Sequence, residues 1–463
     1  MMVGEKTNEN AMPFEQGGVV VHFGSLSLLD KRISFRRVLL TILVVFYIFC
    51  RVFTARYDLD LPLPWWGAPI SAFLFLAVAW VGCENRSERK VRSKVFGRYS
   101  LLFLIPWAVF AALSFLWMVE GVAGYYHLTR PPMEFIKMLS IACLLYGLGI
   151  EYGEKTADRF FAIVSAMYLL SFAYGLINAG VDGFVAYLID NDAAMRRYYE
   201  VHDICLAMPM FVYYYWCVNT DARCRSFKLA VAIFISVAGF KRIAIAAVIV
   251  LFFVARLIRG KGQGRNFYID LFLQCSLFMF AVFWVFFTGT GIIEIIAKNY
   301  GIDMMSRDVV YSYMQQFASL DFWHSLGGGM GIEFCNVKLL LASGAELHNI
   351  TISALHNDFL KLDIEMGLAW FLFWLIYTLF IVPALLGKSF GRNARTQYVL
   401  LTVFSFIVYA TDNTTTYPVF QTVLYVILAS AALCSLGSQE KTKGYCRTPS
   451  GFPMAAQAGD LKR

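Results

Sequence analysis

Residues 227–258 read FKLAVAIFISVAGFKRIAIAAVIVLFFVARLI, and they decide the path of the chain through a membrane. Two apolar runs, 227–240 and 242–258, are almost continuous and meet at the Phe-Lys-Arg sequence of residues 240–242. If they form one long helix, every later segment changes side. If the helix breaks at Phe-Lys-Arg, the two cations lie in a short turn at the membrane surface.

The composition of the whole chain places it among polytopic membrane proteins. Its 463 residues are 59% hydrophobic, 17% aromatic and only 16% charged, with a mean hydropathy of +0.60. A membrane-spanning helix needs about 20 apolar residues. On that basis we predict an all-α integral membrane protein with about twelve transmembrane helices, at about 37–54, 63–83, 99–118, 134–150, 160–178, 203–218, 227–240, 242–258, 268–287, 364–386, 397–412 and 417–436.

The lysines and arginines support this division of the chain. With both termini cytoplasmic, most of the 40 lie in or beside the segments predicted as cytoplasmic, as the positive-inside rule requires. One fused helix at 227–258 would scramble this alternation, so the break is favoured. The same distribution explains the net charge of +8, because the basic stretch ENRSERKVRSKVFGR at 84–98 is a cytoplasmic segment, and no nucleic-acid partner is expected.

The domain organisation follows from the spans. We predict a cytoplasmic N-terminal tail (1–36), nine transmembrane helices (37–287), a large outer loop (288–363), three more helices (364–436) and a cytoplasmic C-terminal tail (437–463). The N-terminal tail has no pattern of a secretory signal. A long loop in a compact protein is usually functional. The ten scattered cysteines form no zinc or disulfide pattern.

The end of the large loop carries the first candidate site. It contains two His-Asn pairs, His348-Asn349 and His356-Asn357, and the second is followed by nine residues, Gly367 and an apolar run. Histidine is the natural general base near neutral pH. Asn357 could orient the ring or bind a substrate. The alternative is a pair of interfacial residues that caps a helix.

Cations on the same outer side form the second candidate. Lys241 and Arg242 lie opposite the basic side, and Arg307 opens the amphipathic segment SRDVVYSYMQQFASLDFWHSLGGGMG at 306–331. Arginine binds phosphate in a bidentate manner. Snorkelling anchors and surface charges are the alternatives. The glycine run at 327–331 is no phosphate-binding loop, because no Gly-Lys-Ser/Thr follows it, and it predicts a tight turn or a close backbone approach.

The outer segment 179–202 is acidic and then basic, and within it Asp192 and Arg197 could contact a substrate, although a solvated loop is the alternative. No HExxH motif, DxD motif or Cys/His cluster stands out as a set of metal ligands, so no metal site is predicted.

The order of these features resembles the O-antigen ligase / Wzy-type polymerase superfamily of bacterial membrane glycosyltransferases. The features are a basic short outer loop, then a large outer loop that opens with Ser-Arg and passes a glycine-rich turn, then His-Asn, nine residues, Gly and an apolar helix. The resemblance covers about 225–390. It implies a GT-C-like membrane enzyme in the bacterial inner membrane. Such an enzyme moves a glycan from undecaprenyl diphosphate to an acceptor sugar at the periplasmic face, without a metal or other cofactor.

The family's residues map onto His356, Arg242 and Arg307 as the catalytic set. The arginines would neutralise the diphosphate and the histidine would activate the acceptor hydroxyl. Lys241, Asn357, Arg197, His348 and Asn349 are the predicted substrate-binding residues. The predicted partners are the lipid bilayer, the lipid-linked donor and an acceptor that is either a second lipid-linked repeat or lipid A–core, and a chain-length regulator stays open as a further partner.

Three alternatives remain at this stage. Ligases tend to show Gly, two residues, then Gly, Thr or Tyr, whereas Trp370 follows Gly367-Leu368-Ala369, so the prediction leans to a polymerase rather than a ligase. A lipid-linked oligosaccharide flippase would show repeats and broken helices with midplane charges. A structural or sensory membrane protein is the last alternative.

Overall fold

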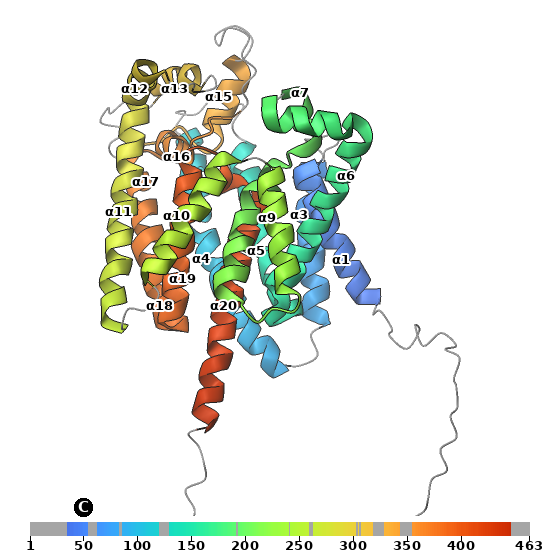
Figure 1. Cartoon of the computed structure of the whole chain (residues 1–463). Coiled ribbons are helices and arrows are strands. Elements are labelled where there is room, and N and C mark those ends of the chain that lie inside the picture. The colour runs from blue at the N-terminus through green and yellow to red at the C-terminus, as the bar shows by residue number, and fades with distance from the viewer. Residues whose placement is uncertain are drawn as a thin grey trace, which may run out of the picture.

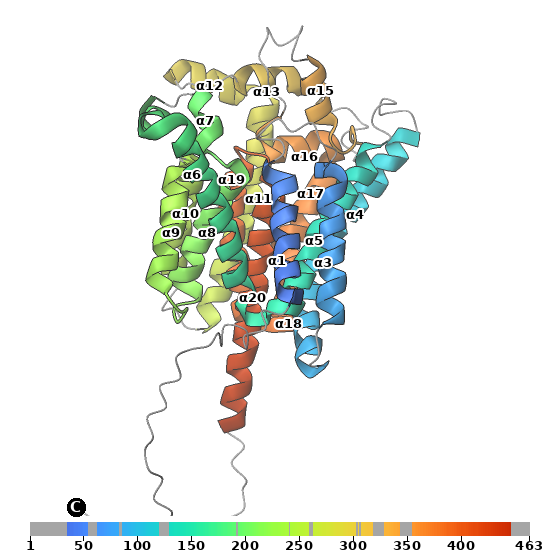
Figure 2. The ribbon, with the colours of Figure 1, turned by 90° about the vertical axis from the view of Figure 1, so that its right-hand side faces the viewer.

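A computed structural model of the chain describes residues 35–53, 63–82, 86–119, 129–190, 193–239, 241–258, 263–301, 304, 307–317, 328–342 and 354–445. The described residues form helices and connecting turns, with no strand among them. The predicted all-α class is therefore confirmed. Figures 1 and 2 show a bundle of long helices with a layer of shorter helices across one end.

The bundle contains the apolar helices. In chain order these are α1 (Phe35–Ile48, continued by a π-helical turn at Phe49–Phe53), α3 (Leu63–Val81), α4 (Arg86–Val119), α5 (Arg130–Tyr152), α6 (Thr156–Asp190), α8 (His202–Tyr213, with a π-helical turn at Tyr214–Val218), α9 (Arg225–Ala238), α10 (Arg242–Ile258), α11 (Gln263–Gly289), α17 (Leu368–Ile376), α18 (Val382–Phe390), α19 (Arg392–Tyr409) and α20 (Pro418–Tyr445). A π-helical turn at Tyr377–Ile381 joins α17 to α18.

Five helical stretches among the described residues are long and apolar enough to cross a membrane. They are Ser87–Val119, Arg130–Ile189, Phe267–Gly289, Leu368–Phe390 and Pro418–Leu436, and Trp66–Val81 is a shorter apolar helix. The other predicted spans also coincide with helices, but these are shorter or carry charged turns, such as Arg392 and Arg395 in α19. The stretch Arg130–Ile189 bends at Gly153, where a 3-10 turn separates α5 from α6.

The surface of the bundle is apolar where lipid would contact it. Phe253 on α10 and Phe272 on α11 are 65% and 71% exposed, and Leu170 on α6 is 73% exposed. Large apolar side chains exposed in this number would be an aggregation hazard in water. In a bilayer they face lipid chains of the same polarity, which agrees with the membrane class predicted from composition.

The break predicted within residues 227–258 is present. Helix α9 ends at Ala238 and α10 begins at Arg242, with Lys241 between them. Gly239 ends α9 with its backbone N–H bonded to the carbonyl of Ile235. Helix α4, by contrast, begins at Arg86 and runs for 34 residues, so much of the basic segment predicted as a loop at 84–98 is helical.

The segment predicted as a large loop is an ordered helical layer in its described parts. It contains α12 (Ile292–Tyr300), α13 (Arg307–Gln315), α15 (Phe334–Ala342) and α16 (Asp358–Met366), which lie together at the upper end of the bundle in Figure 1. Its core is a separate apolar cluster, formed by Val310, Tyr311, Met314, Phe334, Cys335, Leu339, Ala342, Leu355, Leu360 and Ile364. Helix α1 begins and α20 ends at the opposite end of the bundle (Figure 1).

Candidate functional site

The His-Asn motif with its glycine nine residues later is one capped helix. Asn357 is the N-cap of α16, and its side-chain oxygen accepts a hydrogen bond from the Leu360 N–H at 3.1 Å. The nine residues Asp358–Met366 are the helix itself. Gly367, with φ of 80°, ends α16 and begins α17. The spacing therefore sets the length of a short helix that holds His356 at its start.

The glycine run closes the other end of this helix. The backbone N–H groups of Met330 and Gly331 donate to the carbonyl oxygens of Ile364 and Glu365, each at 3.0 Å. These are terminal carbonyls that α16 itself leaves unpaired. A Cβ at Gly329 would lie 2.2 Å from the Glu365 carbonyl oxygen. The close backbone approach predicted for this run is confirmed.

His356 has an unusual backbone conformation. Its φ is 49°, in the left-handed region that few non-glycine residues adopt. The Tyr311 hydroxyl of α13 donates to its carbonyl oxygen at 3.3 Å. Strained residues of this kind cluster at functional sites. The conformation turns the chain sharply between Leu355, which is buried, and the Asn357 cap, and it leaves the His356 ring about one third exposed.

Asp412 lies beside the His356 ring, in the turn between α19 and α20. Its Oδ1 atom is 3.4 Å from Nδ1 of His356 and accepts hydrogen bonds from the Asn413 N–H at 2.9 Å and the Tyr417 hydroxyl at 3.3 Å. A second bridge holds the two elements together, because Asp358 accepts from the Thr415 N–H at 2.8 Å and from its hydroxyl at 2.5 Å. The start of α16 is thus fastened to the α19–α20 turn.

His202 approaches Asp412 from a third direction. Its Nε2 atom is 3.0 Å from both carboxylate oxygens of Asp412. The next residue, Asp203, accepts hydrogen bonds from the backbone N–H groups of Val419 and Phe420 at 2.9 and 2.7 Å. Those groups open α20, so Asp203 caps that helix from outside. This cap fixes the start of α8 against the α19–α20 turn and brings His202 to Asp412.

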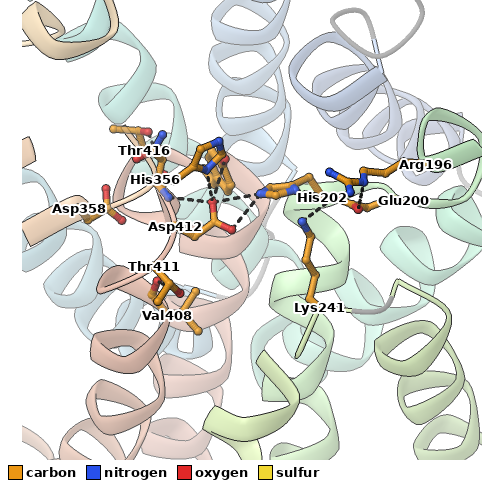
Figure 3. Close-up of polar contacts among 12 residues, drawn as sticks. Arg196, Glu200, His202, Lys241, His356, Asp358, Val408, Thr411, Asp412 and Thr416 are labelled. Carbon is orange, nitrogen blue, oxygen red and sulfur yellow. Dashed lines mark hydrogen bonds and ion pairs between the residues drawn. The ribbon is translucent and has the colours of Figure 1, made fainter. Parts of the chain in front are cut away.

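Beyond His202 the polar contacts continue as a chain of charges (Figure 3). Glu200 Oε1 is 2.7 Å from Nδ1 of His202 and 2.5 Å from Nζ of Lys241. Arg196, on α7 (Ala193–Tyr199), has its Nε atom 3.7 Å from the other oxygen of Glu200. The order from α16 to α7 is histidine, aspartate, histidine, glutamate and then the two cations.

The charges in this chain stabilise one another. Burial acts to raise the pKa of Glu200, but the hydrogen bond from His202 and the charge of Lys241 outweigh it and hold that pKa at about 2. Burial acts to lower the pKa of His202, yet Asp412 raises it to about 9. For Asp412, burial is outweighed by His202, and its pKa lies well below the usual range. At neutral pH the cluster therefore holds an imidazolium between two carboxylates.

The three cations predicted on the outer side, Lys241, Arg242 and Arg307, have different surroundings in the structure. Lys241 joins the cluster, whereas Arg242 begins α10 with an exposed side chain. Arg307 begins α13 one turn before Tyr311, the residue that binds the His356 carbonyl. Burial raises the pKa of Tyr311 to about 12, against the opposing charge of Arg307. The catalytic roles of Arg242 and Arg307 stay predictions.

Three predicted substrate-binding residues cannot be placed. His348 and Asn349 lie outside the described residues, and so does the side chain of Arg197, whose backbone belongs to α7. Asn357 is fully buried and its side-chain oxygen caps α16, as the alternative interpretation expected. A substrate contact by Asn357 stays a prediction.

Sequence reasoning did not single out His202, Asp412 or Glu200, and Glu200 lies in the polar segment 179–202. Asp412 had a local signal, since it opens the polar turn Asp412-Asn413-Thr414-Thr415-Thr416 between two apolar spans. His202 follows a charged segment at the start of a predicted span. Neither signal pairs the two residues, because 210 positions separate them.

The same residues could hold a metal ion. Among the described residues, the ligand atoms of His202, His356 and Asp412 all lie within 4.8 Å of one another. Two imidazoles and one carboxylate are a common ligand set for Zn²⁺ and related ions.

The sequence matches no family model, and no curated protein matches it. The functional interpretation therefore depends on the geometry of the site and on the sequence resemblance.

Proposed function

We propose that the protein is a membrane glycosyltransferase of the O-antigen ligase/polymerase type, with polymerase favoured over ligase. It would transfer a glycan from undecaprenyl diphosphate to an acceptor sugar at the periplasmic face of the bacterial inner membrane. The observation that carries the proposal is the pairing of His356 with Asp412, beside cations and at one end of an apolar bundle.

The pairing suits His356 to act as a general base. An ionised carboxylate only accepts hydrogen bonds, so the proton on the His356 ring lies on Nδ1, facing Asp412. The lone pair of Nε2 is then free for the acceptor hydroxyl. As the hydroxyl oxygen bonds to the sugar's anomeric carbon, Nε2 takes its proton and the bond from that carbon to the phosphate oxygen breaks. Asp412 acts as a positioning residue that fixes the tautomer.

Charge on the leaving diphosphate needs compensation. Lys241 and Arg196 lie at the end of the charge chain, and Arg242 and Arg307 begin helices on the same side of the protein in the predicted topology. Hydrogen bonds from such groups to a charged partner contribute about 1.5–3 kcal/mol each. The exposed apolar surface of the bundle suits a polyprenyl chain that stays in the bilayer during transfer.

The full proposal includes about twelve spans, with both termini in the cytoplasm and the layer of α12, α13, α15 and α16 in the periplasm. The described ends of the chain, at α1 and α20, lie at the end of the bundle opposite this layer (Figure 1), which supports that arrangement. The concentration of basic residues in the predicted cytoplasmic segments supports it independently.

The test is deletion of the gene in its native host, with envelope glycans separated by gel. Single repeats on lipid A–core would indicate a polymerase, whereas bare core with accumulating lipid-linked chains would indicate a ligase. Lipid-linked single repeats that stay inaccessible from the periplasm would indicate a flippase and overturn the proposal. If the glycans on lipid A–core do not change, the lipid A-directed form of the proposal is refuted, and the same comparison is made on capsular and secreted polysaccharide.

Complementation then tests the base. The wild-type gene and Glu294→Gln, which changes a carboxylate on α12 that is hydrogen-bonded to Gln315, should restore the glycan pattern. His356→Ala should not, although the protein is present in the membrane at wild-type level. Restoration by His356→Ala would show that His356 is not the base.

A further inference from the structure

Three side chains from distant parts of the chain converge on one small volume. His202 comes from the start of α8, His356 from the turn before α16, and Asp412 from the α19–α20 turn. Nε2 of His202 and Nδ1 of His356 are 3.0 and 3.4 Å from carboxylate oxygens of Asp412. In a tetrahedral Zn²⁺ site, bonds of about 2.0–2.1 Å place neighbouring ligand atoms about 3.3 Å apart. These two separations bracket that value, and the ligand atoms of all three residues lie within 4.8 Å of one another.

Glu200 supplies the support that metal-binding histidines usually have. A ligating imidazole almost always gives its other N–H to a carboxylate or carbonyl, which fixes the ring and the tautomer. Glu200 Oε1 lies 2.7 Å from Nδ1 of His202, on the side of the ring away from Asp412. An ion would displace the proton from Nε2 of His202, and the proton that remains on Nδ1 would be held by Glu200. Lys241 balances the charge of Glu200 from the far side.

The cluster is also accessible. The side chains of His202 and His356 are 32% and 34% exposed, while Asp412 is 5% exposed. An ion can therefore reach the two rings from solvent and find the carboxylate behind them. A fourth ligand position is left for water, as in metal sites that stay open to exchange.

We infer that His202, His356 and Asp412 form a binding site for a divalent transition-metal ion of the Zn²⁺ class, and that an ion bound there inhibits the enzyme. The binding site stands on the geometry alone. The inhibition depends on the proposed function, because it concerns the role of His356 as the base. The metal-independent reaction implied by the sequence resemblance would then be the activity of the ion-free form.

The inhibition follows from the two nitrogens of one ring. In the ion-free protein Nδ1 carries the proton and Nε2 has the lone pair that accepts the acceptor's proton. An ion on Nδ1 uses that nitrogen's lone pair, so a neutral imidazole must carry its proton on Nε2. Nε2 then has no lone pair for the acceptor hydroxyl. Binding of the ion and catalysis by His356 thus exclude each other.

Binding is measured first, without any assay of activity. The full-length protein, purified in lipid nanodiscs with an affinity tag free of histidine, is stripped with a chelator and titrated with Zn²⁺ against a chromogenic zinc indicator. We expect one ion per chain. Co²⁺ should give the intense visible absorption of a tetrahedral site, a readout that needs no variant. A protein that binds no Zn²⁺, or that gives only the weak spectrum of octahedral Co²⁺, would overturn the inference.

Variants locate the ion. His202→Ala, the more conservative His202→Gln, and His356→Ala should each weaken Zn²⁺ binding by at least about tenfold, and Glu200→Gln should weaken it by about 10–100-fold through the supporting contact. Glu294→Gln should bind like wild type. Equal binding by wild type and all the cluster variants would place the ion elsewhere and refute the site. Variants are compared only where elution volume and melting temperature show a folded protein.

Transfer assays separate the two proposals. Zn²⁺ should inhibit transfer by the wild type, and a chelator should reverse the inhibition. For His202→Gln, half inhibition of its own ion-free rate should need at least about tenfold more Zn²⁺. If Zn²⁺ binds at the cluster but transfer is unaffected, the proposed inhibition is refuted and His356 is not the base. If Zn²⁺ binds and no transfer is found under any condition, the metal site stands and the proposed function fails.

Discussion

Replacing Asp412 by asparagine removes the group that orients the proposed base. Asp412 accepts from His202, His356, Tyr417 and the backbone of Asn413, so its carboxylate is the centre of the cluster. An asparagine side chain has almost the same shape, but it offers one oxygen instead of two and no charge. Its amide group can also donate to Nδ1 of His356, which would leave the proton on the wrong ring nitrogen.

The size of the effect can be estimated from the contacts. One hydrogen bond to a charged group contributes about 1.5–3 kcal/mol. The bond between His356 and Asp412 is long, at 3.4 Å, but the tautomer also depends on it. We expect a loss of about 2–3 kcal/mol of transition-state stabilisation, which corresponds to a rate about 30- to 150-fold lower.

The assay is the rate of glycan transfer by purified protein in nanodiscs, with a lipid-linked donor and products separated by gel. Glu294→Gln is the matched control, and it should keep the wild-type rate. His356→Ala should fall further than Asp412→Asn, because it removes the base itself. A rate for Asp412→Asn within about threefold of wild type, in a folded protein, would refute the positioning role and with it the main support for His356.

Four further predictions concern the elements that hold the site. Asn357→Ala should lower stability by about 1 kcal/mol through loss of the cap, while Asn357→Ser should keep both cap and activity; equal loss of transfer in both would instead show a substrate contact. Lys361→Ala should destabilise by about 3–5 kcal/mol, because it leaves the Glu333 carboxylate buried without the ammonium 2.9 Å away, and a shift in denaturation midpoint worth less than about 1 kcal/mol would contradict this. Lys361 and Asn336 outweigh the effect of burial and hold the pKa of Glu333 at about 2, below the usual 4.5. The contribution of this carboxylate to stability is therefore complete above pH 4.5 and is lost as the pH falls toward 2. In Glu333→Gln the melting temperature should depend less on pH across that window than in the wild type. Gly329→Ala should destabilise by about 1–3 kcal/mol, because its Cβ would meet the Glu365 carbonyl, and a wild-type melting temperature would contradict that close approach.

Local patterns in the sequence account for several elements. Apolar runs of the right length identified the helices of the bundle, because an apolar helix of that length is stable in lipid regardless of which helices pack against it. The two cations at 241–242 identified the break between α9 and α10, because charge in the bilayer centre is costly. The glycine run was correctly interpreted as a close approach, since only a residue without Cβ permits one.

Other features depended on the neighbours of each residue. The spacing from His356 to Gly367 was read as a motif, and the structure shows it to be a nine-residue helix with a cap at each end. The segment 288–363 was expected as a large outer loop, and its described parts include helices that pack over their own apolar core. Short helices of this kind are marginal alone and form because packing compensates the cost of nucleation.

Composition and periods of a few residues are enough to predict that the chain is helical, apolar and suited to a bilayer. The sequence also marked His356 as a residue of interest. The partners of His356 are set by contacts between distant parts of the chain. Asp203 fastens α8 to α20, Asp358 fastens α16 to the α19–α20 turn, and together they bring His202, His356 and Asp412 into contact. Those contacts join positions up to 210 residues apart, and no local pattern specifies them.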